Sequence, residues 1–414
     1  MYKKTGLVLL SLLIGSASFA QKKDKAIFKE YKPGYYQNSI LKDIRNIDNK
    51  LDKKENEKIF FMDQSKMKLP NKLSYYKKLW ANPSISQGNT GSCWCFSTTS
   101  MYESEIFRIT GKKVKLSEMY TVYNEFIEKA KGFVNSRGTT IFEQGSEANA
   151  VTRSYKKNGF VPAKEYTGLK DGRRFHTHKK MYHEMKAYLK KVKENNAWNE
   201  DEVVATIKAI MNHYIGVPPT KFTVDGKEYT PKSFMTDYCK INPDDYVEIL
   251  SVKSEPYWKQ VSYKVPDNWW NSKEYYNLPL DIFMKVLKKA IKNGYTMSIG
   301  GDVSEAGFLR TTNVALVPTF DIPSKYIDEN ARVFRFANGS TTDDHGMHLM
   351  GYYKDKDGKD WYLIKDSSSG SRNNDEAAPE FGYYFFSSDY IKLKMMGFTV
   401  HKDALKKYLK KFKK

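Results

Sequence analysis

The spacing of hydrophobic residues is helical in several segments before residue 300. Apolar side chains in residues 93–110 recur at helical intervals, and Gly111 follows as a stop signal. A second helix is expected at 146–155, where Ser146 is a suitable N-cap. Residues 279–293 predict a third helix, with six apolar positions on one face: Ile282, Phe283, Val286, Leu287, Ala290 and Ile291.

The last third of the chain carries short aromatic and β-branched runs bounded by turn residues, a pattern typical of strands. They lie at 349–353, 361–364 and 383–386, and residues 295–299 form an earlier run of the same kind. A helix-rich first part followed by a strand-rich last part predicts an α+β architecture.

The middle of the chain differs from both parts. Residues 171–215 are charged and helix-forming, Pro218-Pro219 interrupts them, and residues 220–278 are rich in loop-forming residues. We interpret 171–278 as a mostly helical insertion within one domain that spans 21–414.

The first twenty residues have the pattern of a signal peptide. Lys3 and Lys4 precede an apolar run at 6–15, and small residues at Ser18 and Ala20 suit a cleavage site. The apolar run is shorter than the roughly 20 residues that a bilayer requires, so cleavage after Ala20 is favoured over a membrane anchor. The sequence therefore predicts an exported protein, periplasmic or secreted.

The chain of 414 residues carries a formal net charge of +21 at pH 7. Such a surplus favours anionic partners, but no nucleic-acid-binding module accompanies it. We expect no nucleic-acid partner and interpret the charge as a basic solvated surface. The three cysteines, Cys93, Cys95 and Cys239, are too few for a disulfide framework and leave at least one thiol free.

Residues 87–96, with the sequence Gln-Gly-Asn-Thr-Gly-Ser-Cys-Trp-Cys-Phe, carry the strongest chemical signal. Cys93 stands where a helix begins, and the positive end of the helix dipole favours a thiolate there. The Gln87 amide and the Cys93 backbone N–H together supply two donors for an oxyanion hole. Cys95 lies about 200° further round the helix and is expected in the core.

A nucleophilic thiol needs a base and an acceptor that orients the base. His345 precedes a predicted strand, and His348 lies on the opposite face of it, so only one of the two can face the cleft. Asp366 ends the next strand and is the candidate orienting residue; an exposed strand-end aspartate is the alternative. His176, His178 and His183 are candidate ligands for a metal site, but few acids and no cysteine lie nearby, so neither metal nor cofactor is expected.

These motifs resemble those of papain-like cysteine peptidases. Residues 87–96 resemble the active-site signature, 344–347 the histidine strand, and 365–367 the segment that completes the triad. His345 follows Cys93 by about 250 residues, against the 130–150 typical of papain, and the insertion accounts for the difference. Residues 277–280, 290–294 and 301–304 resemble the bleomycin hydrolase and aminopeptidase C branch, and residues 216–219 with 230–234 resemble its helical insertion. The resemblance covers about 75–400.

The resemblance implies a two-lobed papain-like fold and hydrolysis of peptides through an acyl-enzyme. Cys93 would be the nucleophile, His345 the base, Asp366 the orienting residue and Gln87 the oxyanion donor. Gln144 and Gly145 resemble the strip that binds the substrate backbone. Aminopeptidase specificity and a homo-oligomer, hexameric in that branch, are further implications.

Three departures from the branch keep alternatives open. Asp366 stands where the family has asparagine, and Ser368 stands where a tryptophan covers the histidine pair, which suggests a wetter pair. The family's C-terminal arm in the cleft is replaced by a lysine-rich tail at 402–414. An endopeptidase and a catalytically weakened binding protein are the alternatives.

The tail has an apolar stripe at helical spacing, formed by Leu405, Tyr408, Leu409 and Phe412. A basic amphipathic segment of this kind can dock on the protein's own body or lie on an anionic membrane surface. Its lysines argue against a position inside a narrow cleft.

Overall fold

The computed structural model describes residues 32, 34–51, 60–372 and 376–412. The chain divides into two units, residues 1–59 and residues 60–414. In the first unit the described residues form the helix α1 (Leu41–Leu51) and a π-helical turn before it. The signal-peptide prediction lies outside the described residues. No helix in the described part of the chain combines the length and apolar character of a bilayer-crossing segment.

The second unit combines helices and a large mixed sheet. Its helices are α2 (Cys93–Thr110), α3 (Glu118–Asn135), α4 (Ala148–Asn158), α5 (Lys179–Glu194), α6 (Glu200–Ile215), α7 (Pro231–Ser233), α8 (Leu280–Lys292), α9 (Glu329–Ala337), α10 (Ser388–Lys394) and α11 (Lys406–Leu409). Its strands are β1 (Lys77–Lys78), β2 (Phe222–Val224), β3 (Lys227–Tyr229), β4 (Tyr246–Leu250), β5 (Gln260–Val261), β6 (Tyr275–Asn277), β7 (Met297–Gly301), β8 (Phe308–Leu309), β9 (Val314–Ala315), β10 (His345–Lys354), β11 (Asp360–Lys365), β12 (Tyr383–Ser387) and β13 (Met395–His401).

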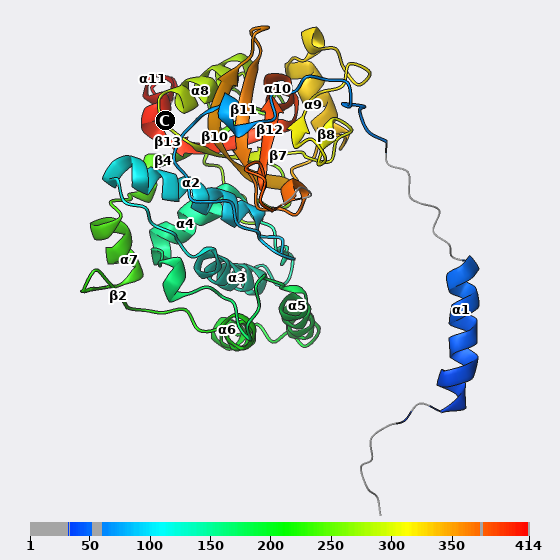
Figure 1. The fold of residues 1–414 in the computed structure, drawn as a ribbon. Helices are drawn as coiled ribbons and strands as arrows, with labels where there is room; N and C mark the ends of the chain where they lie inside the picture. The colour runs from blue at the N-terminus through cyan, green and yellow to red at the C-terminus, as the bar shows by residue number, and fades with distance from the viewer. Residues whose placement is uncertain (1–31, 33, 52–59, 373–375, 413–414) are drawn as a thin grey trace, which may run out of the picture. The chain divides into compact units, whose positions relative to one another are not determined.

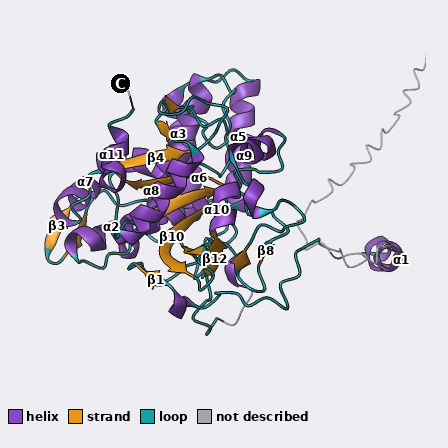
Figure 2. Ribbon diagram, turned by 90° about the horizontal axis from the view of Figure 1, so that it is seen from above, coloured by secondary structure: helices purple, strands orange, loops and turns teal. Residues whose placement is uncertain are grey.

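The main sheet runs in the order β5-β6-β4-β13-β7-β10-β11-β12-β9-β8, with β1 paired to β10, and β2 and β3 form a separate hairpin. The pairs β13–β7, β7–β10, β10–β11 and β11–β12 are antiparallel. Helices α8 and α10 lie beside these strands (Figure 2). The α+β architecture expected from the sequence is confirmed.

Helix α2 is the central element that joins the helical and sheet-rich parts (Figure 1). It packs on β7 and β10, where Thr98 hydrogen-bonds Ser298 over 3.0 Å. Because side chains alternate along a strand, the neighbouring Ile299 joins the core that includes Phe283 of α8 on the other face. Helices α3, α5 and α6 lie on the side of α2 away from β10–β12, which gives the two lobes (Figure 1).

The predicted helices begin and end close to the residues that the pattern indicated. Helix α2 covers Cys93–Thr110, and Gly111 ends it in the left-handed region at φ 72°. Helix α8 matches the predicted apolar face, with Phe283 and Leu287 fully buried. The helix expected from Ser146 begins two residues later at Ala148, and Glu147 rather than Ser146 occupies the N-cap.

The segment interpreted as an insertion has a mixed structure. Its first half forms α5 and α6, as the charged helical pattern indicated. Its second half supplies β4, β5 and β6 to the main sheet, and β4 pairs with β13. Residues 246–277 therefore belong to the sheet that holds the site, which differs from a mostly helical insertion over the whole of 171–278.

The C-terminal tail packs on the body of the protein. Leu405 is 1% exposed, and Tyr408 and Leu409 pack against the core around α8. The Phe412 ring contacts Trp258 and Tyr276, with centroids 5.6 and 4.8 Å apart. The apolar stripe is therefore used for docking on the protein itself.

Candidate active site

Cys93 is the first residue of α2 and is partly exposed, whereas Cys95 and Cys239 are buried. The first N–H groups of a helix have no partner within the helix, so the Cys93 thiol lies beside free backbone donors. Cys95 fills core space, as expected, and its Sγ donates to the Glu118 carbonyl over 3.3 Å. Burial raises the pKa of the Cys95 and Cys239 thiols, which keeps both unreactive.

Gln87 is held on both sides of its amide. Its backbone N–H donates to the Ser367 carbonyl over 2.9 Å, and its Oε1 accepts from the Ser367 hydroxyl over 2.7 Å. One N–H of Nε2 donates to the Thr90 carbonyl over 2.7 Å. An amide nitrogen carries two N–H groups, so a second donor remains for a ligand beside Cys93.

The loop between Gln87 and Cys93 is packed too closely for side chains at its glycine positions. Gly88 has φ +66°, and a Cβ there would lie 2.3 Å from the His176 carbonyl oxygen. The Asn89 N–H donates to that same carbonyl over 2.8 Å. The segment around His176 thus supports the catalytic loop through its backbone, a role that the sequence did not indicate.

Gln144 lies against this loop. Its Oε1 accepts from the Gly91 N–H over 3.2 Å, and its carbonyl accepts from the Trp94 indole N–H over 3.1 Å. Gly145 follows, and a Cβ there would lie 2.3 Å from Oδ2 of Asp267. The missing side chain at Gly145 lets the Asp267 carboxylate approach the site.

His345 begins β10 and bridges the thiol and a carboxylate. Its Nε2 lies 2.6 Å from Oδ1 of Asp366, and its ring also hydrogen-bonds Cys93. Burial by itself would lower the pKa of His345, but the Asp366 charge and the hydrogen bonds to Asp366 and Cys93 outweigh burial and raise this pKa well above its usual value. The arrangement favours an imidazolium at His345 beside the Cys93 side chain.

Asp366 is enclosed by donors. Its Oδ2 accepts from the Ser368 N–H over 3.1 Å, from the Ser368 hydroxyl over 2.6 Å and from the Ser371 hydroxyl over 2.7 Å. Burial opposes ionisation, yet His345 and the two serines hold the pKa of Asp366 below its usual value. The Asp366 side chain is 0% exposed. Ser368 therefore hydrogen-bonds the carboxylate rather than leaving the pair wet.

Comparison with known proteins agrees with this geometry. Residues 143–414 match the model of the Peptidase C1-like family. The chain belongs to the Peptidase C1-like family. It is 21% identical to aminopeptidase C of Streptococcus thermophilus over 94% of this chain and 93% of that protein. It is 23% identical to aminopeptidase G of Lactobacillus delbrueckii subsp. lactis over 78% of this chain and 81% of that one.

A solved structure of PepW from Lactobacillus rhamnosis aligns with a TM-score of 0.58 at 19% identity, covering 80% of this chain and 83% of that one. The family match and this structural likeness confirm the papain-like fold and the cysteine-peptidase class that the motifs indicated. As a C1-like peptidase, the protein hydrolyses peptide bonds.

The nearby His348 is packed in the protein interior. His348 is buried, and its Nδ1 lies 2.9 Å from the Ser100 hydroxyl on the α2 side of β10. Burial and the nearby Lys365 ammonium hold the pKa of His348 well below its usual value. Within the described ranges, no cluster of three or more His, Cys, Asp or Glu side chains has the arrangement of a metal site.

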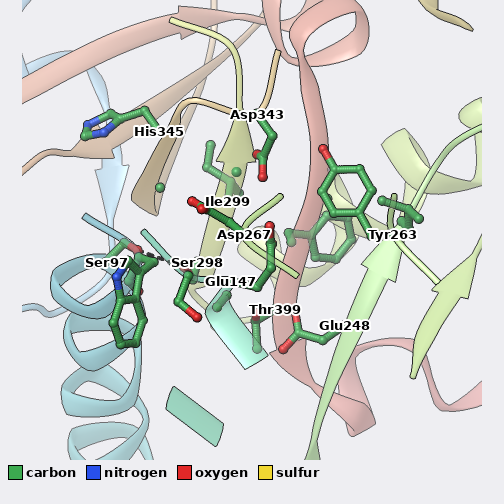
Figure 3. A pocket seen from close by; sticks show the side chains of 18 of the residues that line it. Ser97, Glu147, Glu248, Tyr263, Asp267, Ser298, Ile299, Asp343, His345 and Thr399 are labelled. Carbon is green, nitrogen blue, oxygen red and sulfur yellow. Dashed lines mark hydrogen bonds between the residues drawn. The ribbon is translucent and has the colours of Figure 1, made fainter. Parts of the chain in front are cut away.

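A pocket that begins at Cys93 and His345 is lined by residues that the sequence did not single out. Five acidic residues line it: Glu147, Glu248, Asp267, Asp343 and Asp344. Figure 3 shows Asp343, Asp267 and Tyr263 around a common space with His345 at its edge. The Asp343-Asp344 pair directly before His345 is the sequence feature that could have indicated an acidic pocket beside the base.

Proposed function

We propose that this peptidase is a cysteine aminopeptidase with Cys93 as nucleophile and His345 as general base. The observation that carries the proposal is the bridging imidazole, which bonds Cys93 on one side and lies 2.6 Å from the Asp366 carboxylate on the other. The chain matches relatives named aminopeptidase C and aminopeptidase G over most of their lengths, and these matches support the exopeptidase assignment.

The chemistry follows from these contacts. The Cys93 thiolate attacks the carbonyl carbon, and the oxyanion is held by the second Gln87 Nε2–H and the Cys93 backbone N–H. The His345 imidazolium gives its proton to the departing amine as the C–N bond breaks. The neutral imidazole then takes a proton from water as the water oxygen attacks the thioester carbon, and the C–S bond breaks to release the acid and restore the Cys93 thiolate beside the His345 imidazolium. Asp366 keeps the ring oriented throughout.

The test uses fluorogenic peptides that differ only in a free or an acetylated amino terminus. The wild type should cleave the free peptide faster, and iodoacetamide should abolish cleavage. Cys93→Ala should be inactive, and Cys239→Ala, which removes a buried thiol, should retain activity. Faster cleavage of blocked peptides would establish the endopeptidase alternative, and activity in Cys93→Ala would overturn the nucleophile.

Export, oligomeric state and surface contact extend this proposal. The pattern of residues 1–20 supports export, which N-terminal sequencing of the mature protein tests. The resemblance to the bleomycin hydrolase branch supports a hexamer, which light scattering after size exclusion tests. Weak contact of the lysine-rich tail with anionic lipid is tested by vesicle sedimentation with and without residues 402–414.

A further inference from the structure

The pocket beside the catalytic pair has the opposite charge to the chain as a whole. Five acidic residues line it and no lysine or arginine does among the described residues, although the chain carries a net charge of +21. Carboxyl groups buried together are unfavourable unless a proton or another cation neutralises them. The pocket therefore has a cation-binding character that the hydrolysis steps at Cys93 do not require.

Three of the five acids already interact with other groups, and one of them, Asp344, accepts from the Val303 N–H over 3.0 Å. Glu248 accepts from the Thr399 hydroxyl over 2.6 Å, and burial raises its pKa to about 7 despite that bond. Asp267 lies in the field of the buried Lys129 ammonium, which itself donates to the Glu143 carbonyl over 2.7 Å.

The other two acids, Glu147 and Asp343, face each other without a cation. Their carboxyl groups hydrogen-bond one another, which requires a shared proton, and Glu147 Oε1 is buried with no donor among the described residues. Burial is the largest cause that raises the pKa of both carboxyl groups. The charge of Asp343 raises the pKa of Glu147 further, and the charges of Asp267 and Asp344 raise that of Asp343. His345 is the one cationic group close to Asp343 on its own segment, and it is engaged with Cys93 and Asp366.

Tyr263 adds an unused acceptor to the same space. Its side chain is 4% exposed, and its hydroxyl has no hydrogen-bond partner among the described residues. The ring lines the pocket, and its hydroxyl end lies on the side of Asp343 in Figure 3. A buried hydroxyl without a partner is unfavourable, so the group is suited to a ligand that supplies a donor.

We propose that this pocket binds an ammonium group of the peptide substrate next to the scissile bond, with Glu147 and Asp343 as counter-charges and Tyr263 as a hydrogen-bond partner. The proposal rests on the proposed function and names its substrate class. An ammonium group supplies a positive charge to the carboxyl pair and N–H donors to Glu147 Oε1 and the Tyr263 hydroxyl, which have no hydrogen-bond partner among the described residues. It replaces the proton that the carboxyl pair shares when the pocket is empty.

The reach of a peptide agrees with this position. With its first carbonyl carbon at Cys93, the α-amino nitrogen is two bonds away, about 2.5 Å from that carbon. It then lies at the mouth of the pocket, which begins at Cys93 and His345. A lysine side chain near the scissile bond would place its ammonium group further inside the pocket. The α-amino group and a lysine side chain are therefore the two sources of the ammonium. A metal ion is disfavoured, because the described side chains form no metal-binding group.

The experiment measures a selectivity ratio, the kcat/KM for a charged substrate divided by that for its neutral match. One pair of substrates compares free with acetylated amino termini, and a second compares acetylated peptides with lysine or norleucine before the scissile residue. The variants are Glu147→Gln, Asp343→Asn and Tyr263→Phe, with Glu228→Gln as the control because its ion pair with Lys221 is exposed on the β2–β3 hairpin. Iodoacetamide titration counts competent sites in each preparation.

We expect Glu147→Gln and Asp343→Asn to lower at least one ratio by about tenfold or more, mainly through KM. Tyr263→Phe should lower it less, and Glu228→Gln should not change it. A fall in the first ratio assigns the α-amino group, and a fall in the second assigns a lysine side chain. Ratios unchanged within twofold in both acid variants overturn the proposal and leave the pair as a buried shared proton.

Binding to Cys93→Ala keeps this test separate from the proposed function. Calorimetry compares Ala-Ala-amide with its acetylated form on Cys93→Ala and on the double variant with Glu147→Gln. A preference for the charged peptide that Glu147→Gln removes supports the pocket even if the wild type cleaves neither peptide. Equal binding of both peptides to Cys93→Ala excludes the α-amino group as the source, and equal binding of the acetylated lysine and norleucine peptides as well contradicts the pocket even if the wild type is an active peptidase.

Discussion

Asp366→Asn is the sharpest test of the His345–Asp366 pair, because the amide has almost the same shape as the carboxylate. Oδ1 of Asp366 lies 2.6 Å from His345 Nε2, while Oδ2 accepts from three donors of Ser368 and Ser371. An amide supplies only one acceptor atom. One of these two sets of contacts must therefore be lost.

Each orientation of the amide has its own cost. If its oxygen keeps His345, its nitrogen faces the Ser368 N–H, and two donors then meet at about 3 Å. If its nitrogen faces His345, Nε2 becomes an acceptor and the ring proton moves to the nitrogen beside Cys93, the wrong tautomer for a base. Hydrogen bonds to charged groups contribute about 1.5–3 kcal/mol and neutral ones about 1 kcal/mol. The difference of about 0.5–2 kcal/mol corresponds to a loss of about 2- to 30-fold in kcat/KM.

The pH profile distinguishes this mechanism from a general loss of stability. The Asp366 carboxylate raises the pKa of His345, so its removal lowers that pKa. The imidazolium is then lost at lower pH, and the alkaline limb of the kcat/KM profile should move to lower pH. Asp281→Asn, which alters an exposed aspartate paired with Lys285, should leave the profile unchanged. A kcat/KM within twofold of wild type and an unmoved alkaline limb in Asp366→Asn would refute the reasoning.

Three further predictions concern the surroundings of the site. In the native protein, iodoacetamide should label Cys93 but not Cys95 or Cys239, whose pKa is raised by burial, and peptide mass spectrometry should show comparable labelling only after unfolding. Gly88→Ala should lower both Tm and kcat because its Cβ would lie 2.3 Å from the His176 carbonyl oxygen, whereas Gly226→Ala, which has a similar φ and open space, should lower Tm less and leave kcat intact. Leu405→Ala should lower the free energy of unfolding by about 2–5 kcal/mol in urea titrations, and an unchanged unfolding midpoint would show that the tail is not docked. The same variant should keep the preference between free and blocked amino termini. The tail packs on Tyr276, whereas the adjacent Tyr275 lines the pocket, and neighbouring side chains of a strand point to opposite faces.

Local sequence signals sufficed where one segment determines both position and chemistry. Cys93 lies at a helix start because the loop before it and the apolar spacing after it are both visible in residues 87–110. The opposite environments of His345 and His348 follow from strand alternation, and Asp366 follows from the end of β11. These residues could be predicted because each depends on neighbours within about a dozen positions.

The pocket wall could not be predicted in this way, because its members come from four distant segments. Glu147 precedes α4, Glu248 lies in β4, Tyr263 and Asp267 follow β5, and Asp343 precedes β10. Strands β5 and β6 contain only two and three residues, and β6 pairs in parallel with β4. Such short strands lack a period that a sequence pattern can show, so this part of the sheet was interpreted as insertion.

The order of residues before β10 links the chemistry of the site to its charge. In extended backbone, side chains two positions apart share a face, so Asp343 is directed to the same side as His345. The intervening Asp344 accepts from the Val303 N–H over 3.0 Å and contacts Ser304 instead. One short segment thus places a carboxyl group in the pocket and the base against the thiol. Any change at Asp343 therefore acts on both the pocket and the base. For this reason the ratio of kcat/KM for charged and neutral substrates, rather than the rate alone, separates binding of an ammonium group from effects on catalysis.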